Sequence, residues 1–315
     1  MSAFRYVLHR LLPAALTMVA LSVAVFAATE VLPGDAVGVV AGPNATPVQL
    51  ARVRAELGLD RPAVDRYLEW AGGALHGDLG RSLIGGRPVA DILGDSLPNS
   101  LLLAGMVYAL LIPLALLLGV TAGLRPGSVR DRLISGATLL GVGVPEFLTA
   151  GLLLALLTHT LGLVPGVAVV PLGGSALDAP ETLVLPVLTL LLLSLAATTR
   201  LIRAAVAGIL AAPYLEAARL NGIRGRRLVL RHILPNTLAP AVQVLATGAG
   251  GLLGGAVVVE TVFNYPGLGS ALTTAVTLRD VPTLQGVALL LCAITLLALL
   301  LGDVCTRLLT PWAAS

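Results

Sequence analysis

The chain contains no lysine, so all 20 basic side chains among its 315 residues are arginine. A Walker A loop needs a lysine on the nucleotide phosphates, and a Schiff base needs a lysine amine. The sequence therefore excludes a P-loop ATPase and a lysine Schiff-base enzyme. ATP hydrolysis linked to this chain must come from a partner, which would hold the ATP and Mg²⁺, and we expect no cofactor in the chain itself.

Cysteine and histidine are scarce, with two and four residues. Cys292 and Cys305 fall in the last apolar segment, where a helix would separate them by about 20 Å, too far for a disulfide. The histidines are scattered without metal-ligand spacing. Neither a metal site nor a catalytic motif such as a nucleophile elbow is predicted. We therefore expect a chain that is not an enzyme.

Charged residues are also few, at 12%, against 57% hydrophobic residues and a mean hydropathy of +0.94. This composition is typical of membrane proteins. The apolar stretches are continuous and rich in leucine and alanine, whereas barrel strands would alternate. The sequence therefore predicts an all-α membrane protein.

Six apolar segments are long enough to span a bilayer. The first follows Arg5 and Arg10 and also fits a signal peptide, but its length favours an uncleaved helix. The fourth is bounded tightly by Arg200 and Arg203, which can snorkel to the interface. The expected helices cover residues 8–31, 97–124, 133–161, 183–201, 238–262 and 284–301.

The distribution of arginine predicts the orientation of these helices. With the N-terminus inside, most arginines fall in the cytoplasmic loops and most acidic residues fall outside. The opposite orientation would violate the positive-inside rule at almost every loop. We therefore expect both termini to be cytoplasmic.

About 65 residues separate the first two helices, on the predicted outer side. Thr46 and Gln49 form a capping-box pattern with Pro47 at the first helical position, and Gly58 can end that short helix. A second short helix is expected from Pro62. This segment is predicted to be a small folded external insert, serving either as a docking surface or lid or as a decorative loop.

A basic segment from Tyr214 to Asn236 separates two apolar stretches. Pro213 favours a helix start, and Gly222 permits a sharp turn after it. Within this short helix we expect Tyr214, Ala217, Ala218 and Leu220 to form a small apolar face for a partner, with Glu216 and Arg219 pointing elsewhere. The alternative is that the arginines only signal orientation near anionic lipid.

Glu146 lies within the third apolar segment, directly after Pro145, where the helix is expected to kink. A carboxylate inside a membrane is costly and is a candidate functional residue. It either lines a translocation path, favouring amine or metal cations, or makes an interhelical or interfacial contact. Glycines at 248, 250, 251, 254 and 255 suggest close helix packing, or a sliding surface between subunits.

The Glu216-Ala217-Ala218 sequence with Gly222 four residues later resembles the EAA loop of bacterial ABC-importer permeases. Over nearly its whole length the chain is similar to the permease family for dipeptides, oligopeptides and nickel. The departures are Pro213 and Asn221, where the family often has aspartate and lysine. The other matching pieces are residues 32–35, 57–62, 77–82, 88–89, 255–260, 263, 266–269 and 279–282.

The resemblance implies the type I importer fold and a bacterial inner-membrane location. It implies four kinds of partner: a second homologous permease, two ATPase subunits, an external solute-binding protein and membrane lipid, with no nucleic acid. The transported solute would be a peptide, a nickel chelate or an opine. The competing hypothesis is a secondary transporter or channel that works alone, but the sequence has no internal repeat.

The resemblance also implies a division of the chain and of its sites. Residues 1–95 would hold the first helix and the insert, residues 96–305 the core with a coupling loop at 212–235, and residues 306–315 a cytoplasmic tail. Coupling to the ATPase is assigned to Tyr214, Glu216, Ala217, Ala218, Arg219 and Gly222. An external gate is assigned to Glu260, Pro266, Gly267 and Gly269. The family has a similar proline motif near Pro145, but Glu146 fills a variable place in it, so the assignment of Pro145 and Glu146 to the path rests on the intramembrane carboxylate itself.

Overall fold

The computed structural model describes residues 3–31, 36–42, 44–168 and 176–309. Within these ranges the regular structure is helical, apart from one isolated bridge between Arg81 and Pro88. The predicted all-α class is therefore confirmed. The motif at residues 32–35 and tail residues 310–315 lie outside the described residues.

Five long helices have the length and apolarity to cross a membrane, and a bent pair supplies a sixth span. The expectation of six spans is met in this form, although the helices extend past their predicted ends. The second one starts at Val89, so the proposed boundary at 95/96 falls inside a continuous helix. The five are α1 (Ala3–Val31), α5 (Val89–Gly123), α8 (Val184–Leu210), α11 (Leu234–Val262) and α13 (Val281–Leu309).

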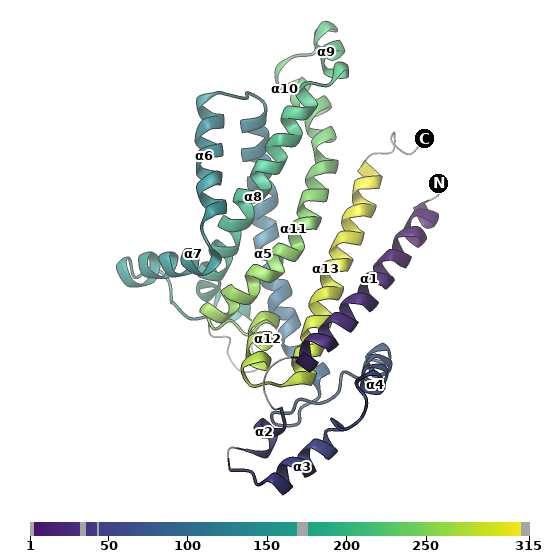
Figure 1. Cartoon of the computed structure of the whole chain (residues 1–315). Coiled ribbons are helices and arrows are strands. Elements are labelled where there is room, and N and C mark those ends of the chain that lie inside the picture. The colour runs from purple at the N-terminus through teal and green to yellow at the C-terminus, as the bar shows by residue number, and fades with distance from the viewer. Residues whose placement is uncertain (1–2, 32–35, 43, 169–175, 310–315) are drawn as a thin grey trace.

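The third predicted helix is not straight, as the expected kink at Pro145 anticipated. Helix α6 (Val129–Gly143) ends before Val144, which is extended, and α7 (Glu146–Leu153) leaves at 105° to it. A proline disfavours helical geometry in the residue before it, which explains the break. Helix α7 continues as a π-helix over Leu154–Thr160, and Figure 1 shows it running across the bundle axis.

The predicted end of the fourth helix at residue 201 is wrong. Helix α8 continues to Leu210, with Arg200 and Arg203 inside it. The guanidinium of Arg203 forms an ion pair with Asp131 of α6. Because Asp131 neutralises its charge, Arg203 can lie within the helix and does not have to mark a helix end at the membrane interface. Hydropathy alone could not show this neutralisation.

Helices α5, α8 and α11 form the centre of the molecule (Figure 1). One cluster around Leu103, Leu190 and Val259 fills the half toward the insert. A second cluster around Ile202 and Ile233 fills the other half. Helix α13 packs on α11, and α1 packs on the outside of α13.

The predicted insert is a set of short helices at one end of the bundle (Figure 1): α2 (Ala36–Ala41), α3 (Pro47–Glu56) and α4 (Ala63–Leu75). The capping box at Thr46 is present, and Gly58 follows α3 with φ 64°. Arg66 of α4 forms two hydrogen bonds with the carboxylate of Glu30 at the end of α1. The insert is therefore attached to the bundle.

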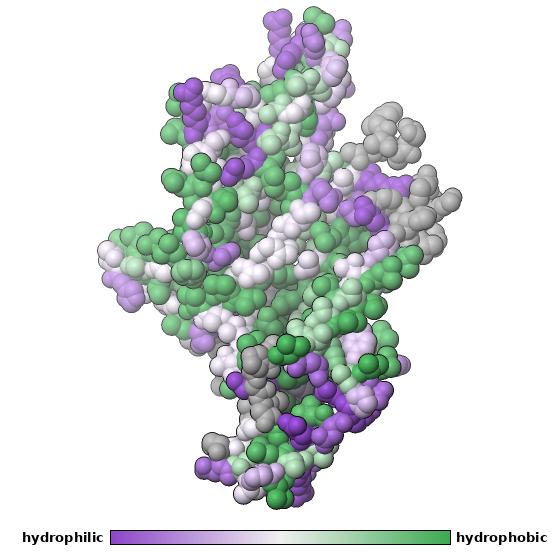
Figure 2. Space-filling view, in the orientation of Figure 1, coloured by the Kyte–Doolittle hydropathy of each residue, from purple (hydrophilic) through white to green (hydrophobic). Residues whose placement is uncertain are grey.

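The surface agrees with a multi-pass membrane protein. Figure 2 shows apolar side chains over the middle of the visible face. Hydrophilic side chains gather over the insert at one end and around α9 (Pro213–Leu220) and α10 (Gly225–Leu228) at the other. The described start of α1 and end of α13 point toward the α9 end, away from the insert (Figure 1).

Candidate coupling helix and solute path

The predicted docking helix is present as α9, which projects from the end of the bundle (Figure 1). Leu215 and Ala218 are buried and anchor it to the cluster formed by α5, α8 and the start of α11. The opposite side is exposed and carries Glu216, Ala217 and Leu220. A short helix held from one side and free on the other can enter a groove on a partner.

The expected face of this helix needs correction at Ala218 and at Glu216, because Glu216 was expected to point elsewhere but shares the exposed side with Ala217 and Leu220. Ala218 was placed with Tyr214, Ala217 and Leu220 on the apolar docking face, but its side chain is 7% exposed and packs inward. The prediction missed Leu215, which is fully buried and sets which side of the helix faces the protein. Partial burial also raises the pKa of the Tyr214 hydroxyl, so that group stays protonated at neutral pH.

Gly222 makes the predicted turn after α9. Its φ is 80°, in the left-handed region that glycine adopts without a Cβ penalty. The Gly222 amide donates to the Arg219 carbonyl at 3.0 Å, and the Ile223 amide donates to the Ala218 carbonyl at 3.0 Å. These two bonds form a Schellman motif, which fixes the direction of the chain beyond the helix.

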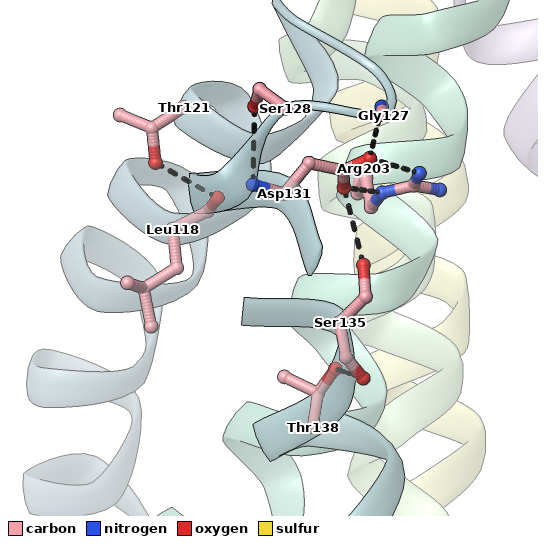
Figure 3. A network of polar contacts seen from close by, with 8 residues as sticks. All are labelled: Leu118, Thr121, Gly127, Ser128, Asp131, Ser135, Thr138 and Arg203. Atoms are coloured by element: carbon pink, nitrogen blue, oxygen red, sulfur yellow. Dashed lines mark hydrogen bonds and ion pairs between the residues drawn. The ribbon is translucent and has the colours of Figure 1, made fainter. Parts of the chain in front are cut away.

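A polar network joins α6 to α8 on the side of the bundle that carries α9 (Figure 3). Asp131 accepts hydrogen bonds from the Nε and Nη2 of Arg203, and from the Gly127 amide at 2.8 Å. Ser135 donates a further bond, and Ser128 caps the start of α6. The Asp131 side chain is 4% exposed, so this is a buried carboxylate with its acceptors filled.

The proposed gate residues meet at the start of α12 (Leu268–Thr277). The Glu260 carboxylate accepts hydrogen bonds from the amides of Gly269 at 2.7 Å and Ser270 at 3.2 Å. Ser100 of α5 donates to Glu260 at 2.7 Å and accepts from the Leu268 amide. The carboxylate thus caps a helix N-terminus, where the dipole favours negative charge.

Gly267 and Gly269 are required by this close packing. A Cβ at position 267 would overlap the Glu260 carboxylate, and one at 269 would overlap the backbone of Val257. Pro266 takes part through its carbonyl, which accepts from the Asn99 amide at 2.8 Å. The four predicted gate residues are therefore brought together.

No sequence pattern indicated two other members of this cluster. Asn99 and Ser100 belong to α5 and follow Pro98 in an otherwise apolar stretch. The Tyr265 hydroxyl donates to the Asn99 carbonyl at 2.8 Å. Burial, followed by the nearby Glu260 charge, raises the pKa of Tyr265 well above its usual range, so its hydroxyl remains a donor.

A second junction attaches the insert to α13. Asp280, just before this helix, accepts hydrogen bonds from the Ser82 hydroxyl and from the Leu83 amide at 3.0 Å. Thr283 donates to the same carboxylate at 2.7 Å. Two of the matching sequence pieces, near residues 77–82 and 279–282, are thus in contact in space.

Glu146 lines a cavity of about 250 Å³ between α5, α8 and α11. Tyr108, Ser194 and Thr198 contribute hydroxyl groups to its wall. Pro145 precedes Glu146 as the N-cap of α7 and aims the chain toward this cavity. Of the two interpretations, the geometry therefore favours a carboxylate that faces an open space.

The glycines of α11 differ in their surroundings, and the predicted sliding surface between subunits stays a prediction. Gly250 and Gly255 pack against neighbouring helices, where a Cβ would lie 3.3 Å from Thr295 and 3.4 Å from Leu190. Gly248, Gly251 and Gly254 lie on an exposed face with no neighbouring atoms within 4 Å of such a Cβ.

Comparison with known proteins places these features in a family. Residues 115–315 match the binding-protein-dependent transport system inner membrane component, and residues 3–109 match the N-terminal part of such components. Together the two matches cover most of the chain.

Curated relatives align over almost their full length. A putative peptide transport system permease protein of Brucella abortus (strain 2308) is 34% identical over 285 residues, 90% of this chain and 91% of the relative. A glutathione transport system permease protein of Escherichia coli O6:H1 is 34% identical over 308 residues, 97% of each. A putative peptide permease protein of Brucella ovis is 33% identical over 312 residues, 98% of each.

The fold class, the multi-pass helices and the recognised family are thereby confirmed, and the stand-alone transporter or channel is not favoured. The chain belongs to the family of binding-protein-dependent transport system inner membrane components, and it is the membrane-spanning permease subunit of an ABC importer.

Proposed function

We propose that this permease forms half of the translocation path of a peptide importer. The peptide class is supported by the relatives, which are named as permeases for peptide and glutathione transport. A single chain offers one α9, so a two-sided machine requires a second, homologous permease. Two ATPase subunits would bind the ATP and Mg²⁺, one at each coupling helix.

The observation that carries this proposal is the position of α9. Its buried side is tied to α8 and α11 through Leu215 and Ala218, while Glu216, Ala217 and Gly222 are accessible from outside. Movement of a partner bound there would be transmitted to the helices that line the Glu146 cavity. Tighter nucleotide binding to one of two conformations would supply the bias for alternating access.

The insert is the proposed contact for the solute-binding protein. It lies at the opposite end of the bundle from α9 (Figure 1), and its attachment through Ser82 and Asp280 connects it to α13. The gate residues Glu260 and Gly267 lie at the same end, at the start of α12. This arrangement supports a location in the bacterial inner membrane with the insert outside and both termini in the cytoplasm.

Co-purification tests the coupling helix. The chain is expressed with the products of its neighbouring genes, as wild type and as Ala217→Arg, which places a large charge on the exposed face of α9. Ala51→Arg is the matched control, because Ala51 is an exposed alanine of α3 in the insert. We expect the ATPase with wild type and the control, and its loss with Ala217→Arg. Equal recovery with all three would overturn the assignment of α9.

A further inference from the structure

Two residues of opposite charge on the spanning segments, Glu146 and Arg200, make no hydrogen bond or ion pair within the described part of the chain. Asp131 and Arg203, by contrast, neutralise each other. An unpaired charge at membrane depth is costly, and such residues commonly mark the route of a substrate. The Arg132 side chain on α6 also has no polar contact within these residues, so what distinguishes Glu146 and Arg200 is that each lines a cavity.

Both charges face the same side of α8. Glu146 lines the cavity of about 250 Å³, and Arg200 lines a second cavity of about 660 Å³ between α6 and α8. Ala197 is exposed and belongs to the walls of both cavities, so they meet at this residue. Arg200 follows Ala197 by one helical turn, about 4.5 Å along the axis. The two neighbouring cavities, which together we call the groove, thus carry a carboxylate at one end and a guanidinium at the other.

The space around the carboxylate is open, and a few hydroxyl groups stand in its otherwise apolar wall. The Glu146 side chain lies against Gly255, where a Cβ would come within 3.7 Å of it. Ser194 and Thr198 lie in the same wall and can donate or accept hydrogen bonds. Taken together, the two cavities fall within the roughly 300–1,000 Å³ that small-molecule sites occupy.

We propose that this groove binds a zwitterionic, peptide-like solute during its passage, with the ammonium group at Glu146 and the carboxylate at Arg200. A guanidinium matches a carboxylate with two parallel hydrogen bonds, and an ammonium donates charge-assisted bonds to a carboxylate. A bare metal cation is disfavoured, because Arg200 would repel it. The inference rests on the proposed function, since the groove must face the path.

Transport in proteoliposomes tests the proposal. The complete complex of this chain, its partner subunits and the solute-binding protein is reconstituted, and uptake of radiolabelled dialanine is measured per ATP hydrolysed. Glu146→Gln and Arg200→Gln remove one charge each with little change in shape. Glu181→Gln and Arg132→Gln are matched controls, because both side chains are exposed and make no polar contact within the described residues.

Each groove variant is expected to lower dialanine transported per ATP by about tenfold, the loss of roughly one charge-assisted hydrogen bond. Glu146→Asp should recover part of this loss, and the controls should match wild type. Recovery of assembled complex is measured for every variant, so that uptake is compared at equal amounts of complex.

Two results would overturn the inference, and they differ. Wild-type transport by both groove variants would show that the charges do not contact the solute, while leaving the importer intact. Absence of ATP-dependent dialanine uptake by the wild-type complex would instead overturn the proposed peptide-import function, and the groove assignment with it.

Discussion

The Asp131 carboxylate of α6 accepts hydrogen bonds from both the Nε and the Nη2 of Arg203, an ion pair that joins α6 to α8 (Figure 3). Arg203 lies two turns before the end of α8, and α9 follows that end directly. The pair therefore connects the broken span of α6 and α7 to the helix that leads into α9, the proposed coupling helix.

Neutralising either partner of this pair should destabilise the protein. Asp131→Asn leaves a partly buried guanidinium without its counter-charge, and we expect a loss of about 2 to 3 kcal/mol in unfolding free energy. Denaturant unfolding of the detergent-solubilised protein measures this loss of unfolding free energy. Arg132→Gln, an exposed arginine on the same helix, should change stability by less than about 0.5 kcal/mol.

The double variant Asp131→Asn, Arg203→Gln distinguishes a true pair from two independent residues. If the two side chains act together, the double variant should be less destabilised than the sum of the single variants. Additive losses would contradict a direct interaction.

Gly267→Ala should disrupt the cap of α12. The added methyl group would overlap the Glu260 carboxylate, and relieving that overlap costs about 1 to 3 kcal/mol. Thermal unfolding followed by tryptophan fluorescence measures the loss. Gly254→Ala is the control: the position is open and helical, so the change should be neutral or stabilising by up to about 1 kcal/mol. Equal effects at both positions would contradict the close packing at 267.

Asp280→Ala should loosen the insert. The substitution removes the acceptor of the Ser82 hydroxyl and the Leu83 amide, which tie the insert to α13. We expect limited proteolysis to cut between residues 76 and 88 several times faster than in wild type. Asp60→Ala removes an exposed carboxylate within the insert itself and should leave the cleavage rate unchanged. Unchanged cleavage of Asp280→Ala would show that the insert is held by other contacts.

Gly222→Ala should weaken the turn after α9. The left-handed backbone of this residue costs a non-glycine residue about 1 kcal/mol, although no atoms crowd the position. We expect less ATPase recovered with this variant than with wild type, because the helix is presented at a different angle. Gly136→Ala, in an open position on α6, should recover the wild-type amount. Full recovery with Gly222→Ala would mean that docking tolerates a rearranged turn.

Local patterns predicted local structure well in this chain. The capping box at Thr46 and the turn at Gly222 depend on residues a few positions apart, and both are present. The kink at Pro145 follows from a backbone rule, but its angle of 105° depends on what α7 packs against. An eight-residue helix such as α9 shows an amphipathic pattern without indicating which side faces its own protein, and this explains the error at Ala218.

Contacts between residues far apart in the chain could not be predicted from the sequence. Asp131 and Arg203 are separated by 72 residues, and Ser82 and Asp280 by 198. Without the packing of the helices, a charged residue near a span can only be assigned to an interface. For this reason Arg203 was expected at a helix end. In the structure α8 continues past Arg203, and its ion-pair partner Asp131 is buried.

The most direct test of the account is ATP-dependent import by the reconstituted assembly. Proteoliposomes contain this chain and the second permease, with or without the ATPase subunits, with the solute-binding protein supplied outside and radiolabelled dialanine as solute. The account predicts uptake that requires ATP, the ATPase subunits and the binding protein, and that falls to background with Ala217→Arg but not with Ala51→Arg. Uptake by this chain alone, driven by an ion gradient, would contradict it and would identify a stand-alone transporter.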